Sequence, residues 1–228
     1  MVLAGTACAP ASAASNTAPT PAAAPPSSAS DRITPTTSWD DSWFARLTAK
    51  HKAVFDTPDY SEGMILGPGQ ATRYMNGMHD ALGATGADVQ TVIVVRHRAI
   101  PFAFNDAMWE KYEIGKDLKI KGNGDLWAIR NPFAGARARS GGDSSRAQNN
   151  DRPQANAVWL SSHGHVLLGC DLATQGYAGT IASHTKRPMK EIYEELKANL
   201  VSGLVLQPNG IYATLRAQEA GCTFMRST

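Results

Sequence analysis

Short apolar runs alternate with amphipathic segments along the last third of the chain. The runs at 165–169, 203–207 and 222–226 have the length and composition of buried strands. The segments between them carry apolar residues at helical spacing, and Pro188 suits the first turn of the helix expected at 188–200. Strands and helices that alternate with short connections favour right-handed crossovers and a mainly parallel sheet.

The same pattern occurs earlier in the chain. Apolar spacing predicts helices at 38–51, 69–86 and 105–113, and a weaker apolar run predicts a strand at 52–56. The stretch "VQTVIVVRHR", 89–98, is β-branched and almost uniformly apolar, which is typical of a central parallel strand covered on both faces. The sequence therefore predicts an α/β fold of three layers, with a mainly parallel central sheet and helices on both faces.

Two regions do not fit this pattern. From Ala9 to Ser30 every residue except Asn16 is Ala, Pro, Ser or Thr, so residues 1–37 are expected to form a disordered extension and 38–228 a single domain. Residues 115–156 are rich in glycine, arginine and polar residues, which indicates an irregular insertion: a surface loop or a mobile lid. Four of its arginines, at 137, 139, 146 and 152, are either candidate anion contacts or solvated loop charges.

The first residues suggest export. "MVLAGTAC" looks like the end of a signal peptide, and an Ala-rich cleavage pattern follows at 11–14. "LAGTAC" loosely resembles a lipoprotein signal, with Gly5 where leucine is preferred, so Cys8 is a candidate lipid anchor. We expect a periplasmic or secreted protein without a transmembrane segment, and a cytoplasmic protein with a disordered N-terminus is the alternative.

Charge and motifs exclude several classes of function. The formal net charge is only +2, and no basic stripe alternates with aromatic residues, which argues against a nucleic-acid partner. The dinucleotide G-x-G-x-x-G spacing, the Walker lysine and the G-x-S-x-G elbow of hydrolases are all missing. We therefore expect no cofactor.

The stretches "HVLLGCDLA" and "NLVSGLVLQPNGIYATLRAQEAGCTFMR" resemble the DsrE/DsrF-like family of sulfur-relay proteins. The matching positions are Cys170, Gly203, Val205, Gly210, Leu215, Gln218 and Gly221. The likeness extends over about residues 50–226, and the insertion at 115–156 has no counterpart in the compact members. The resemblance implies sulfur donor and acceptor proteins as partners, a homo-oligomer, and at most a sulfurtransferase-like carrier activity.

Cys170 is the candidate reactive residue. It follows a predicted strand that ends at Gly169 and precedes a helix that begins near Asp171, the expected N-cap. The positive end of a helix dipole favours an ionised thiol, so Cys170 is interpreted as a persulfide carrier or redox thiol. Five residues of extended chain span roughly 16 Å, which places His165 too far away to act as its base. The alternative is a small buried residue that only fills space.

Two further hypotheses remain open. His163 and His165 are weak candidate metal ligands that would need a third from His79, His97 or His184. A non-catalytic module that binds a small ligand or mediates assembly would retain the same fold without any reaction. Cys222 is expected in the core, and the sequence leaves open whether it pairs with Cys170.

Overall fold

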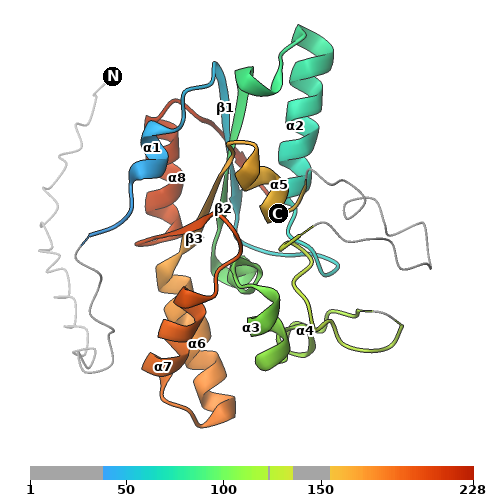
Figure 1. The fold of residues 1–228 in the computed structure, drawn as a ribbon, viewed down its shortest axis with the longest axis vertical. Helices are drawn as coiled ribbons and strands as arrows, with labels where there is room; N and C mark the ends of the chain where they lie inside the picture. Colours follow the sequence, from blue (N-terminus) through green and yellow to red (C-terminus); the bar gives the residue numbers. More distant parts are fainter. Residues whose placement is uncertain (1–37, 123, 136–154) are drawn as a thin grey trace, which may run out of the picture. The chain divides into compact units, whose positions relative to one another are not determined.

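The computed structural model describes residues 38–122, 124–135 and 155–228, and its centre is a five-stranded parallel sheet (Figure 1). The strands lie in the order β4-β3-β2-β1-β5. They are β1 (His51–Thr57), β2 (Val89–Val95), β3 (Val166–Cys170), β4 (Leu204–Gln207) and β5 (Thr223–Arg226). The predicted α/β class is confirmed, and each strand predicted from an apolar run is present.

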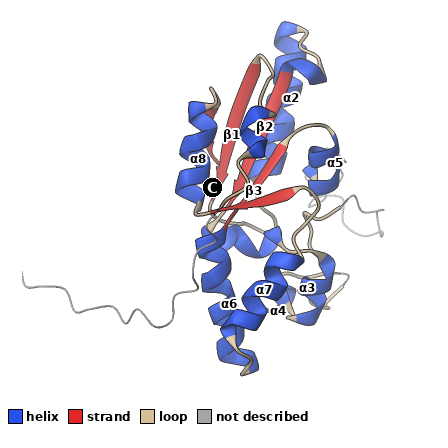
Figure 2. Ribbon diagram, turned by 60° about the vertical axis from the view of Figure 1, so that its left-hand side comes forward, coloured by secondary structure: helices blue, strands red, loops and turns tan. Residues whose placement is uncertain are grey.

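Helices cover both faces of the sheet and extend beyond its carboxyl edge (Figures 1 and 2). The elements are α1 (Ser42–Ala45), α2 (Gly67–Leu82), the 3-10 helices η2 (Gly86–Asp88) and η3 (His97–Ala103), α3 (Asp106–Lys111), α4 (Ile114–Asp117), α5 (Ala157–Ser162), α6 (Asp171–Thr185), α7 (Met189–Ala198) and α8 (Gly210–Glu219). Helices α1 and α8 lie on one face, and α2 and α5 lie on the other. In the same view α3, α6 and α7 lie beyond the ends of the strands.

Alternating side chains of the strands form two separate apolar layers. Ile93 of β2 belongs to the layer under α2, whereas Val92 and Val94 belong to the layer under α8, and all three are fully buried. A strand with helices on both faces has no side that water reaches. This explains why β2 is apolar at nearly every position rather than at every second one.

The boundaries of three elements differ from the prediction. Strand β2 ends at Val95 rather than Arg98, because the chain turns at His97, which adopts a positive φ of 51°. Helix α1 has four residues and ends at Ala45, well before the predicted end at residue 51. Between α1 and β1, the Ala49 amide donates to Gln90 Oε1 at 2.8 Å instead of to a helical carbonyl. Pro188 is the N-cap of α7 rather than a residue of its first turn.

The described part of the predicted insertion is irregular but packed. It contains α4 and an antiparallel bridge between Lys121 and Trp127. Ile120 and Phe133 contribute to the larger apolar core. The remainder, including the four arginines at 137, 139, 146 and 152, lies outside the described residues, as do Cys8 and the extension at 1–37. Among the helices that the structure describes, none combines the length and apolarity needed to cross a membrane.

Candidate functional site

Cys170 lies at the carboxyl end of β3 and is also the N-cap of α6. Its Sγ accepts a hydrogen bond from the Ala173 amide at 3.3 Å, and its carbonyl oxygen accepts one from Thr174 Oγ1 at 3.1 Å. The residue is 6% exposed. The predicted position at a strand end and helix start is therefore correct, but the thiol itself caps the helix.

Asp171 does not cap α6 as expected, because its side chain is used to join two helices. It is buried, and its carboxylate accepts hydrogen bonds from Tyr193 Oη and from Gln175 Nε2, both at 2.7 Å. Burial, together with the bond to Asp171, raises the pKa of Tyr193 above its ordinary value. Asp171 thus ties the first turn of α6 to α7, directly after the candidate thiol.

An ion pair joins the ends of the two central strands. Arg96 follows β2 and binds the Asp56 carboxylate of β1 through two hydrogen bonds, of 2.5 and 2.7 Å. Asp56 is buried, and Arg96 follows β2, the strand that pairs with β3, which ends at Cys170. A Cβ at Gly210 would lie 2.4 Å from Arg96 Cδ, so only glycine lets the start of α8 approach the pair.

The side-chain oxygen of Gln207 is a hydrogen-bond acceptor at the same edge of the sheet, and no described residue donates to it. Gln207 is the residue of β4 that pairs with Cys170 in the register of the sheet, and it is fully buried. Its Nε2 donates to the carbonyl oxygens of Asp40 and Leu206, at 2.9 and 3.0 Å. Its Oε1 is buried and receives no hydrogen bond from any residue that the structure describes. A buried amide oxygen of this kind costs free energy until a donor reaches it.

The sequence interpretation missed this group, although a signal for it was available. Asp56 is the last residue of the run at 52–56 that predicts the first strand, and it lies inside β1. Arg96 comes directly after the strand that was predicted most clearly. Carboxyl ends of adjacent parallel strands meet at one edge of a sheet, so the end residues of strands 1, 2 and 3 could have been grouped from their order alone.

His163 and His165 lie at the opposite, amino edge of the sheet. The His165 Nδ1 accepts a hydrogen bond from the Thr91 amide at 3.1 Å, and burial, followed by the nearby His163, lowers the pKa of His165 to about 4. The Trp159 ring stacks on the His163 ring with centroids 4.0 Å apart. Both imidazoles thus have contacts within the fold. Neither contacts Cys170, which agrees with the separation expected from the length of the strand.

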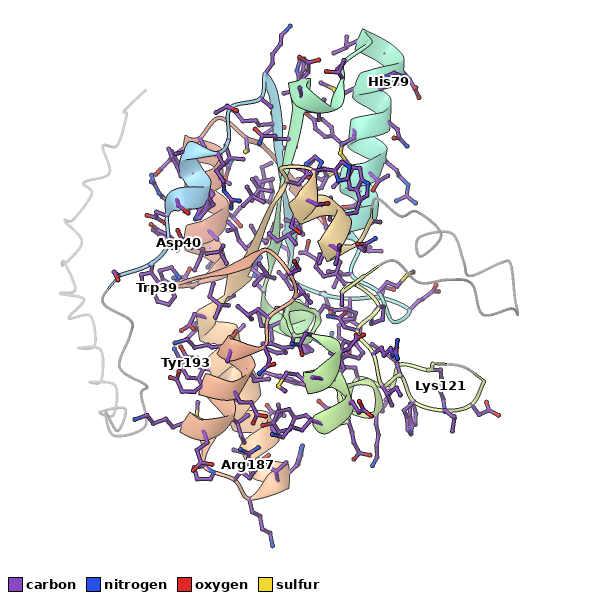
Figure 3. All side chains as sticks on the ribbon, viewed as in Figure 1. Trp39, Asp40, His79, Lys121, Arg187 and Tyr193 are labelled. Carbon is purple, nitrogen blue, oxygen red and sulfur yellow. The ribbon has the colours of Figure 1, made fainter. Side chains whose placement is uncertain are left out.

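The other histidines do not complete a metal site with this pair. His79 lies in the last turn of α2, as Figure 3 shows, and His184 lies in the last turn of α6. His97 begins η3 at the carboxyl edge. Within the described ranges, no group of three His, Cys, Asp or Glu side chains is arranged to hold a metal ion.

Cys222 lies too far from Cys170 to form a disulfide. It precedes β5, whose Thr223 pairs with Ala53 near the start of β1, and Ala53 in turn pairs with Thr91. That level of the sheet is about five residues from its carboxyl edge, roughly 16 Å along the strands. Both cysteines are free thiols, and burial raises the pKa of Cys222 to about 11.

Three of the positions that carry the family resemblance are glycines whose backbone conformation or packing leaves no room for a side chain. Gly203 and Gly221 have positive φ angles of 77° and 86°, and Gly210 packs against Arg96. Leu215, by contrast, is 55% exposed on α8. Comparison with protein-family models, with curated proteins and with solved structures gave no match to this chain.

Proposed function

We propose that this is an exported, DsrE-like sulfur carrier in which Cys170 accepts a sulfane sulfur from a small persulfide. The single observation behind the proposal is the position of the Cys170 thiol. It lies at the carboxyl edge of a parallel sheet and receives the Ala173 N–H at 3.3 Å, and Arg96 follows the adjacent strand at the same edge. Reactive groups of open α/β sheets collect at this edge.

The transfer step exchanges one sulfur–sulfur bond for another. The Cys170 thiolate attacks the outer sulfur of a low-molecular-weight persulfide, R–S–S⁻, forming the Cys170 persulfide while the donor S–S bond breaks and R–S⁻ leaves. Charge and sulfur count are conserved, so no oxidant is needed. The Ala173 amide would stabilise the negative charge of the persulfide that results, and Arg96 at the same edge would add a positive charge.

The burial of the thiol restricts the donor. With 6% of the residue exposed, only a small molecule reaches Sγ while the first turn of α6 stays in place. We therefore expect cysteine persulfide to react faster than a persulfide on a folded protein, since attack requires direct access to the sulfur.

The experiment is incubation of the full chain with cysteine persulfide, followed by intact-mass spectrometry. In a Cys8→Ser background, we expect a gain of one sulfur atom that is retained in Cys222→Ser and lost in Cys170→Ser. Circular dichroism shows whether each variant is folded. An unmodified protein, or an adduct that persists without Cys170, overturns the proposal and favours the non-catalytic binding or assembly module.

A second variant tests the surroundings of the thiol rather than the thiol itself. Arg96→Lys keeps a positive charge but cannot form the two-pronged bond to Asp56. We expect the adduct to form more slowly in this variant and its yield to recover at longer times. An unchanged rate of adduct formation would show that Arg96 has no role in the transfer, while the role of Cys170 would still be decided by Cys170→Ser.

A further inference from the structure

A hollow of about 350 Å³ lies between η3 and the first half of α6. Its walls include the rings of Tyr60 and Tyr177, the apolar side chains of Ile100 and Leu118, and the backbone of α6 at Gly176. Sites for small molecules in proteins are of this size and are mostly apolar with a few polar groups.

Other aromatic rings hold the two tyrosine rings in place. The Tyr60 ring centroid lies 5.6 Å from that of Phe102, which is fully buried. Phe104 stacks on Tyr177 with centroids 6.0 Å apart and the planes 12° from parallel. Two rings fixed before a ligand arrives provide flat apolar walls at little cost in conformational entropy.

The charged groups around the hollow already have partners. Arg98, the cation among the lining residues, binds Asp59 at 3.2 Å and lies 5.5 Å over the Tyr60 ring. The Tyr177 hydroxyl donates to Asp117 at 3.1 Å. An anionic ligand would compete with Asp59 for Arg98, whereas an uncharged one would leave this ion pair in place. The lining is therefore complementary to a neutral molecule.

Gly176 is the lining residue at which the hollow can be altered. It is exposed, and a Cβ built there would meet no heavy atom within 4 Å, so a larger side chain can be introduced without a clash.

We propose that this hollow binds an uncharged planar compound of one or two fused rings, packed against Tyr60 and Tyr177. A bicyclic ring system of about ten heavy atoms fits a site of this volume with room for a polar substituent. The site stands independently of sulfur transfer. It adjoins that chemistry, however, because Ala173, which donates to Cys170 Sγ, also lines the hollow.

The test is a fluorescence titration of the full chain with 2-naphthol in neutral buffer. We expect saturable binding by the unmodified protein and at least tenfold weaker binding by Gly176→Leu, whose side chain would occupy the hollow. Gly77→Leu is the matched control: a Cβ at Gly77 also meets no heavy atom within 4 Å, but this glycine lies in α2. Replacing glycine inside a helix does not weaken the helix, so both variants are expected to fold.

Three results would overturn the proposal. They are no saturation at concentrations up to about 1 mM, equal affinity of the unmodified protein and Gly176→Leu, and equal weakening by Gly176→Leu and Gly77→Leu. A charge series completes the experiment. We expect 2-naphthoate and 2-naphthylmethylamine to bind at least tenfold more weakly than 2-naphthol, and tighter binding of either ion would show that the site selects a charge instead.

Discussion

Cys170 and Cys222 are buried to nearly the same extent, at 6% and 5% exposed, but they lie at different edges of one sheet. At the carboxyl edge, Cys170 has a backbone N–H on its sulfur. At the amino half, Cys222 belongs to an apolar cluster with Val54 and Ala217, and burial raises its pKa to about 11.

The comparison shows that two equally buried thiols can have different surroundings. Parallel strands direct all their carboxyl ends to one edge, where the following helices begin with free backbone N–H groups. Polar residues that end the strands thereby share one edge: Asp56 and Arg96 form an ion pair there, and Gln207 lies at the same edge beside Cys170. The amino edge has no such source of donors, and Cys222 is surrounded mainly by apolar side chains.

The largest effect is expected when the ion pair at the carboxyl edge is removed. Asp56→Ala leaves the Arg96 guanidinium without its buried partner, and we expect the free energy of unfolding to fall by about 3 kcal/mol. Asp59→Ala removes the exposed partner of Arg98 and should change it by less than about 0.5 kcal/mol. Urea denaturation measures both, and equal losses would show that the burial of the Asp56 pair contributes nothing special.

Alkylation compares the two thiols directly. With a pKa of about 11 in place of 9.0, Cys222 has about a hundredfold less thiolate than an ordinary thiol at the same pH. In a Cys8→Ser background treated with iodoacetamide at about pH 8, we expect Cys170 to be modified first and Cys222 to react only when the protein unfolds. Peptide mapping over time identifies each site, and modification of Cys222 before Cys170 would reverse the comparison.

Much of the fold could be predicted from the sequence because its periodicity is strong. The uniform apolar run of β2 and the amphipathic stripe of α7 each indicate one type of element. Short or turning segments were less predictable. The helix expected at 38–51 is reduced to α1, and the end of β2 depends on the φ angle of His97, which no periodic pattern encodes.

The candidate site was predictable only in part. The place of Cys170 follows from strand and helix boundaries, which periodicity gives. The identity of the cap does not, because cysteine and aspartate both fit the sequence pattern and only tertiary contacts decide between them. The Asp171 carboxylate binds the hydroxyl of Tyr193, which lies 22 residues further along the chain, instead of capping α6. This contact depends on how α6 packs against α7, which cannot be predicted from the local sequence.

His165 allows the amino edge to be tested by pH. Its pKa of about 4 in the folded protein lies below the ordinary value of 6.5, so the unfolded chain binds the proton more tightly. Stability should therefore fall as the pH drops from about 6.5 towards 4, and we expect a loss of about 2 kcal/mol between pH 7 and pH 4.5. The measurement is urea denaturation at both values.

Two variants separate His165 from other titrating groups. His165→Asn retains an acceptor for the Thr91 amide but carries no proton in this range, so the loss between the two pH values should shrink by about 2 kcal/mol. His163→Asn, at an exposed position, should keep most of it. Glu195, whose pKa is lowered to about 2, loses its stabilising effect mainly below pH 4.5 and does not interfere. An unchanged pH dependence in His165→Asn would show that the imidazole is not buried in its neutral form.

The smallest effect is expected in a polar cluster that joins α3 to α7 beyond the carboxyl edge. The Tyr112 hydroxyl donates to Glu195 at 2.6 Å and accepts from Arg187 at 2.8 Å, and Lys111 also binds Glu195. Figure 3 shows Arg187 at the far end of the helices that lie beyond the sheet. Hydrogen bonds from Lys111, Tyr112 and Arg187 outweigh burial, which acts in the opposite direction, and lower the pKa of Glu195 to about 2.

Tyr112→Phe removes the hydroxyl but keeps the ring, so it isolates these two hydrogen bonds. We expect the free energy of unfolding to fall by about 1 kcal/mol, since Glu195 retains its contacts with Lys111 and Arg187. Tyr212→Phe, which loses a 3.2 Å bond to the exposed Asp41, is the control and should cost less than about 0.5 kcal/mol. Because the cluster holds α3 against α7, and α7 in turn binds Asp171 beside Cys170 through Tyr193, the loss should speed alkylation of Cys170 by up to about fivefold and leave Cys222 unchanged. Equal acceleration at both cysteines would mean that the two edges of the sheet open together.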